Sequence, residues 1–77
     1  MTNPEKKSSI PETKAVEIAL QEVAKRDSWD STQVYVEIDS LNNGFRIIIR
    51  KIPESPGNFR QIEVSDAGKI ISYRKGK

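Results

Sequence analysis

Two carboxylates spaced two residues apart, Glu37 and Asp39, are the side chains best placed in this sequence to do chemistry. On a β-strand this spacing puts both on one face, where carboxylates can act as an acid and base pair or bind a hard cation. The sequence contains no His and no Cys, which removes the commonest general base, zinc ligands and thiolate nucleophiles. The serines Ser8, Ser9 and Ser55 have no His to activate them. We therefore expect a protein that is not an enzyme and that uses no cofactor or metal.

The length and charge of the chain restrict its class further. Its 77 residues allow one domain with a modest core, and the net charge of +2 is too small to imply a nucleic-acid or membrane partner. The charge is uneven: residues 1–33 carry five basic and six acidic side chains, and residues 34–77 carry eight and five. No apolar run approaches the roughly 18 residues of a membrane span. We expect a disordered lead-in at residues 1–8 and a single α+β domain at residues 9–75.

A hairpin is predicted between two apolar segments, Val34–Leu41 and Phe45–Ile52. Asn43 and Gly44 lie between them, and Asn-Gly is the strongest signal for a type I′ turn, which needs positive φ at both central residues. Such a turn fixes the register of the two strands and thereby the side chains that face each other. The predicted pairs are Ile38 with Ile49, Glu37 with Arg50, and Tyr35 with Ile52.

The alternation of side chains divides this hairpin into two faces. One face is apolar and is expected to form the core, whereas the other mixes charged and apolar residues. Glu37 and Asp39 lie on the mixed face near Arg46 and Arg50, so we interpret them as members of solvated cross-strand ion pairs. The inward set is Val34, Val36, Ile38, Phe45, Ile47 and Ile49, and the outward set is Tyr35, Glu37, Asp39, Arg46, Ile48, Arg50 and Ile52.

A helix is predicted before the hairpin, from about Pro11 to about Arg26. Ser9 and Glu12 match a capping box. Its inward stripe is expected to comprise Val16, Ala19, Leu20 and Val23, with Ala15 and Ala24 at the margins. Ile18 points away from this stripe and is either a lone exposed side chain or a partner contact. Trp29, in the polar turn after the helix, either closes one end of the core or stacks on a ligand.

Two further strands complete the predicted fold. They are Phe59–Ser65 and Lys69–Arg74, joined by a three-residue turn with Gly68 in the left-handed conformation. Regular alternation places Phe59, Ile71 and Tyr73 on the outer face, and the alternative is a bulge at Gly68 that exchanges the two sets. Pro53–Asn58 forms a longer loop that could serve in recognition. The predicted architecture is α+β, one N-terminal helix packed across a four-stranded antiparallel meander in the order α-β-β-β-β.

Two stretches resemble PepSY domains. Residues 10–20 (IPETKAVEIAL) look like their opening helix, and residues 63–71 (EVSDAGKII) look like their closing hairpin. Cystatin-like and nuclear-transport-factor-like folds share the helix-on-meander plan. The resemblance implies a non-catalytic module of protease propeptides and envelope proteins that inhibits or chaperones a partner. Residues 1–9 lack the apolar core of a signal peptide, so we expect a cytoplasmic chain if it is full length and an extracytoplasmic one if it is excised from a larger protein.

The outer sheet face is the surface on which we expect function to lie. Aromatic and aliphatic side chains with an arginine rim are typical of interface centres, so a protein partner or a second copy would bind there. The alternative is a half-solvated sheet face with scattered apolar residues. The predicted binding residues are Tyr35, Ile48 and Ile52 as anchors, Arg46 and Arg50 for register, and Tyr73 or Ile71 at the margin.

A second function, binding of single-stranded nucleic acid, is predicted for the same face with lower priority. Basic residues interleaved with aromatic ones can track phosphates and stack bases. Glu37, Asp39 and Glu63 on this surface weaken the positive field. The residues that suggest it are Tyr35, Arg46, Arg50, Phe59, Arg60, Tyr73, Arg74 and Lys75.

Overall fold

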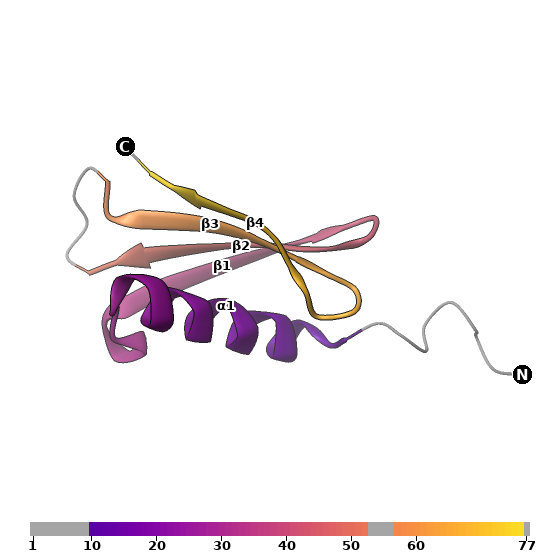
Figure 1. Cartoon of the computed structure of the whole chain (residues 1–77), viewed down its shortest axis with the longest axis horizontal. Helices are drawn as coiled ribbons and strands as arrows, with labels where there is room; N and C mark the ends of the chain where they lie inside the picture. The colour runs from indigo at the N-terminus through magenta and orange to yellow at the C-terminus, as the bar shows by residue number, and fades with distance from the viewer. Residues whose placement is uncertain (1–9, 53–56, 77) are drawn as a thin grey trace, which may run out of the picture.

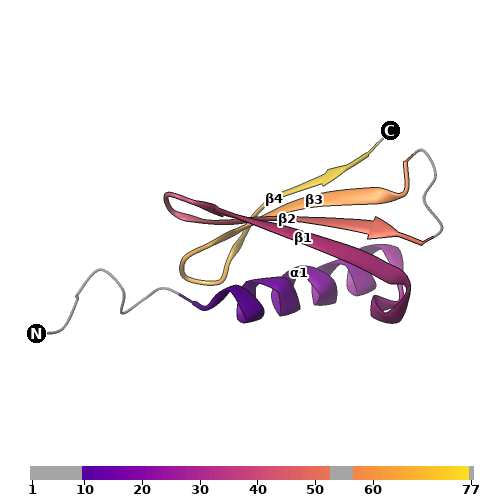
Figure 2. The ribbon, with the colours of Figure 1, turned by 180° about the vertical axis from the view of Figure 1, so that it is seen from behind.

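The computed structural model describes residues 10–52 and 57–76, so the predicted lead-in, Ser9 and most of the Pro53–Asn58 loop lie outside the described residues. Helix α1 is followed by a short 3-10 helix and by one antiparallel sheet in the order β1-β2-β3-β4, with α1 against one face (Figures 1 and 2). This confirms the expected α+β fold. The elements are α1 (Glu12–Asp27), the 3-10 helix (Ser31–Gln33), β1 (Val34–Leu41), β2 (Gly44–Lys51), β3 (Phe59–Ser65) and β4 (Ile70–Lys75).

The core lies between α1 and the two central strands. Small side chains at Ala15 and Ala19 let the helix approach the sheet closely, and both are fully buried. The inner faces of β2 and β3 are also inaccessible to solvent, and α1 packs chiefly on these two strands. The predicted parity of the hairpin is correct, because Ile47 is buried and Ile48 is half-buried on the opposite face. The core comprises Ala15, Ala19, Val23, Trp29, Phe45, Ile47, Ile49, Ile62 and Val64.

The helix is rotated about its axis relative to the sequence-based expectation. Ile18, expected to point away from the core stripe, is partly buried, and a Cβ on Gly68 would lie 3.5 Å from its Cδ1. Val16 and Leu20, expected at the centre of the stripe, are only half-buried, and Ala24 is exposed. The centre of the buried face instead follows Ala15, Ala19 and Val23, which are spaced four residues apart.

The ends of α1 differ from the expected capping pattern. Pro11 is the N-cap residue, in an extended conformation and without a side-chain cap, so the predicted capping box is wrong. The carbonyl of Pro11 accepts the N–H groups of Lys14 and Ala15 at 3.0 and 3.1 Å. At the other end Ser28 adopts the left-handed conformation with φ 59°, and its N–H donates to Ala24 O at 3.0 Å.

The register of the β1–β2 hairpin differs by two residues from the predicted one. Leu41 pairs with Gly44, so Asn42 and Asn43 form the turn, and neither Asn43 nor Gly44 has a positive φ. The type I′ prediction is therefore wrong. A shift of two residues preserves the faces of the strands because side chains alternate with a period of two. The observed pairs include Ile38 with Ile47, Tyr35 with Arg50, and Val36 with Ile49.

Gly44 is needed for close approach of strands and not for turn conformation. A Cβ at this position would overlap the carbonyl oxygen of Val64 on β3. The adjacent Asn43 carbonyl accepts the N–H of Asp66 at 3.0 Å, which ties the tip of the first hairpin to the turn of the second. Backbone atoms cannot move aside as a side chain does, so a larger residue at position 44 must separate β2 from β3.

The second hairpin contains the expected left-handed glycine and a shift in strand register. Gly68 has φ +89°, as predicted. The β3–β4 register shifts between Glu63 and Val64, so that Val64 pairs with Ile70 and Ile62 pairs with Tyr73. Tyr73 therefore lies on the inner face, against the core, and its predicted place on the outer face is wrong.

Substitutions at Asn43 and Gly44 test whether Gly44 is required for the close approach of β3 or for a turn with positive φ. We expect Gly44→Ala to lower the free energy of unfolding by about 1–3 kcal/mol, because the added methyl group meets backbone, and Asn43→Ala to change it by less than about 0.5 kcal/mol. Urea denaturation of both variants measures the difference. Equal destabilisation by the two substitutions would contradict this account and support a turn that requires positive φ at both positions.

Candidate functional site

The outer sheet face carries a ladder of partly exposed cross-strand ion pairs. Arg50 Nη2 lies 3.3 Å from Glu37 Oε1, which confirms the predicted pair although the two residues are diagonal neighbours. Arg46 Nε lies 3.6 Å from Glu63 Oε2 on β3. The charges balance on this face, where Glu37, Asp39 and Glu63 accompany Arg46, Arg50 and Arg74. Such a face has little field to attract phosphates.

The predicted anchor residues do not form one continuous stripe. Tyr35 and Ile52 are 53% and 51% exposed and lie at the β1 side of the sheet, where Ile52 N–H donates to Gln33 O just before β1. Ile48 is half-buried between its cross-strand partners Glu37 and Gln61. The structure therefore brings Tyr35 and Ile52 together at one edge and separates both from Tyr73.

The inner face of edge strand β1 is incompletely covered by α1. The inward residues of β1 are only half-buried, in contrast to Ile47, Ile49 and Ile62, which are fully buried on the neighbouring strands. The reason is that α1 packs over β2 and β3 and makes fewer contacts with β1. The half-buried residues of β1 are Val34, Val36 and Ile38.

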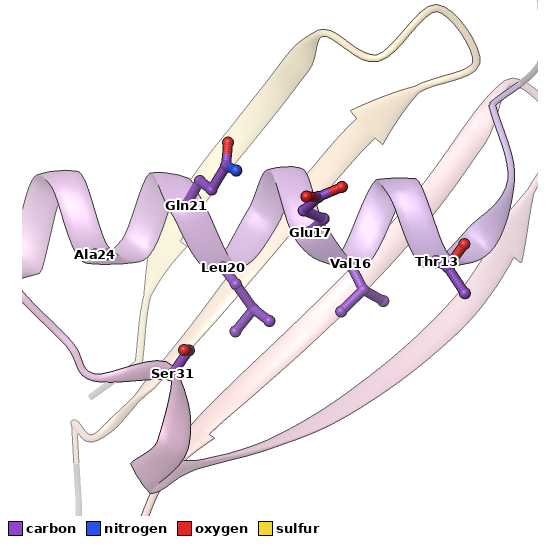
Figure 3. Close-up of a pocket in the computed structure, with 7 residues that line it drawn as sticks. All are labelled: Thr13, Val16, Glu17, Leu20, Gln21, Ala24 and Ser31. Atoms are coloured by element: carbon purple, nitrogen blue, oxygen red, sulfur yellow. The ribbon is translucent and has the colours of Figure 1, made fainter.

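A groove of about 380 Å³ runs along the side of α1. Val16 and Leu20 extend from the same side of the helix into this groove, with Ser31 at one end (Figure 3). Ser31 belongs to the 3-10 helix that leads into β1, so the groove lies on the β1 side of α1. The residues that line it are Thr13, Val16, Glu17, Leu20, Gln21, Ala24 and Ser31.

The two edges of the sheet are built differently. β1 pairs regularly with β2 through all eight of its residues and contains no Lys, Pro or Gly. β4 has six residues, carries the register shift, and places Lys75 on the inner face opposite Arg60. Irregular pairing and an inward-facing charge protect an edge strand from further pairing. β4 has both features, whereas β1 has neither.

A network of charged and aromatic side chains closes the β4 side of the core. Arg60 Nε donates to Asp27 Oδ2 at 2.9 Å, the hydroxyl of Tyr73 donates to the same oxygen, and Lys75 Nζ lies 3.6 Å from Asp27 Oδ1. Arg60 is 8% exposed, and its Nη1 also donates to the carbonyl oxygens of Gly57 and Phe59. The network joins the last residue of α1 to β3 and β4.

Aromatic rings flank this network. The guanidinium carbon of Arg60 lies 4.4 Å from the ring centre of Trp29, and that of Arg26 lies 4.4 Å from the ring centre of Tyr73. Trp29 is buried at the end of the core, which confirms its predicted packing role. Sequence reasoning missed the partner of Arg60, although Arg60 shares strand parity with the inward residue Ile62 and thus required a buried counter-charge.

The network shifts two pKa values in opposite directions. The hydrogen bond from Arg60, and then that from Tyr73, lower the pKa of Asp27 from 3.8 to about 2. Burial, and then the bond to Asp27, raise the pKa of Tyr73 from 10.0 to about 12. Asp27 is therefore ionised and Tyr73 is neutral across the physiological range, so the network is a fixed structural device and not a proton-transfer site.

Comparison with known proteins finds no matching family model, no matching curated protein and no matching solved structure. The resemblance to PepSY domains therefore stays a prediction. In the described part of the chain, no helix has the length and apolar character needed to cross a membrane. Within the same residues, no three acidic side chains gather closely enough to hold a metal ion.

The Asp27 network makes stability depend on acid pH. The pKa of Asp27 is lower in the folded than in the unfolded chain, so its contribution is present above about pH 4 and is lost as the pH falls toward 2. We expect this carboxyl to account for up to about 2 kcal/mol of the loss in unfolding free energy over that window. Asp27→Asn should be less stable at neutral pH and should lack that part of the loss.

Urea denaturation at several pH values between 2 and 7 measures this effect. Asp39→Asn is the matched control, since it removes the same charge from an exposed residue that has no ion-pair partner in residues 10–52 and 57–76. If Asp27→Asn and Asp39→Asn give the same pH dependence, the Asp27 network does not stabilise the fold.

Proposed function

We propose that the protein is a non-enzymatic binding module that pairs an extended segment of another protein with edge strand β1. One observation carries the proposal: within the described residues β1 is a long, regular edge strand that pairs on one side alone, with exposed apolar side chains at its outer face and half-buried ones at its inner face. Tyr35 and Ile52 are exposed on the outer face. Val16 and Leu20 border the groove on the inner face.

A strand added to the edge of the sheet would contact both the inner and the outer face beside β1. The backbone of the partner would supply hydrogen bonds to the free edge of β1, and its side chains would alternate between the two faces. Inward side chains would enter the space beside Val36 and Leu20, and outward ones would contact Tyr35. The affinity would come from main-chain pairing, and the specificity would come from these side-chain contacts.

The proposed partner is a protein, as the sequence predicts, but the proposed binding surface lies at the β1 edge of the sheet and not at the middle of the outer face. Tyr35 and Ile52 remain part of the surface, whereas Arg46 and Arg50 act mainly in the ion-pair ladder. The balanced charges of the outer face do not favour the nucleic-acid alternative. A module without catalytic residues also agrees with what the PepSY resemblance implies.

Selection from a display library of linear peptides tests the proposal whatever the identity of the natural partner. We expect peptides that bind the wild-type protein to lose at least about tenfold in affinity for Leu20→Glu, since a carboxylate would enter the apolar groove. Ile48→Glu is the matched control, because Ile48 is similarly half-buried but lies on the outer face, away from the groove. Thermal unfolding checks that both variants fold.

Three results would contradict the proposal. The first is a library that yields no binder. The second is a set of binders that tolerate Leu20→Glu but fail with Ile48→Glu, which would place the site at the centre of the outer face. The third is a set of binders that lose affinity equally for Leu20→Glu and Ile48→Glu while both variants stay folded, which would show no preference for the groove.

A further inference from the structure

The charges around β1 specify the kind of segment that it would pair with, and this inference rests on the proposed function. Glu37 and Asp39 are the charged residues of β1, and both point to the outer face. Glu37 is bonded to Arg50 at 3.3 Å. Asp39 has no ion-pair partner in the part of the chain that the structure describes, because Arg46 opposite it is directed to Glu63.

A strand added to β1 would place its outward side chains directly beside these carboxylates. Cross-strand neighbours have Cβ atoms about 4.5–5.5 Å apart, within the range at which opposite charges stabilise pairing and like charges oppose it. Lys or Arg on the outer face of the added strand would therefore complement Glu37 and Asp39. Acidic residues in the same places would be rejected.

The inner face of the added strand must be apolar. Val36 and Ile38 are half-buried on this side and pack against the core, as do Val16 and Leu20 of α1, which line the groove. Apolar side chains at alternate positions of the partner would fill the space that α1 leaves over β1. We infer that β1 takes an extended segment of another protein in which basic and apolar residues alternate.

A second copy of this chain fits the edge less well. Antiparallel pairing of β1 with β1 of another copy concentrates four carboxylates, from Glu37 and Asp39 of each chain, along one short interface. Pairing of β1 with β4 of another copy would bring Arg74 to the carboxylates, but β4 carries the register shift and the inward-facing Lys75. The free protein is therefore expected to be monomeric.

Three synthetic peptides as long as β1 test the inference. They alternate Val with Lys, Val with Thr, or Val with Glu, and fluorescence anisotropy measures their affinity for the full chain. We expect the Lys peptide to bind about three- to tenfold more tightly than the Thr peptide at low salt, and the Glu peptide to bind least. The preference should shrink at high salt. The double variant Glu37→Gln, Asp39→Asn should abolish it.

The outcomes separate this inference from the proposed function. Equal binding of the Lys and Thr peptides, sensitive to Leu20→Glu, would overturn the charge preference and leave the edge site standing. Binding by none of the three peptides would overturn both. A mass in sedimentation that rises to that of a dimer at micromolar concentration would overturn the inference in favour of a second copy.

Discussion

The width of a single helix limits how much of the inner face of the sheet it can cover. An α-helix with its side chains is about 10 Å across, and neighbouring strands are about 4.8 Å apart, so one helix covers about two strands of the four. The buried Ala15, Ala19 and Val23 draw α1 onto β2 and β3. Both edge strands are consequently left with half-buried inner faces, and the chain must stabilise or use each of them in another way.

The inner faces of the two edge strands, β4 and β1, are covered to different extents by polar side chains. On the β4 side, Asp27 at the end of α1 gathers Arg60, Tyr73 and Lys75, and the aromatic rings of Trp29 and Tyr73 lie against guanidinium groups. This network joins the end of α1 to β3 and β4 through polar contacts. No comparable network covers the inner face of β1 among the described residues, where the surface stays apolar. The asymmetry is the physical basis for assigning binding to β1.

Much of the fold could be predicted from the sequence because it depends on short-range patterns. Strand alternation gave the correct inner and outer faces of the first hairpin, and the left-handed turn at Gly68 followed from residue type. The register of the first hairpin could not be predicted in this way, because the constraint on Gly44 comes from Val64 on a third strand. Tyr73 was placed outward because regular alternation was assumed for the fourth strand, and the sequence allows a bulge at Gly68 without showing whether one forms. The groove was missed because helix rotation is set by packing, which moved Ile18 inward and Leu20 outward.

Amide exchange of the isotope-labelled protein, measured by NMR with and without the alternating Lys and Val peptide, tests the central claim most directly. The account predicts that alternate amides of β1 become protected on binding, and that the methyl signals of Val16 and Leu20 shift. Protection of β4 amides, or shifts centred on Ile48 and Gln61 with β1 unchanged, would contradict it.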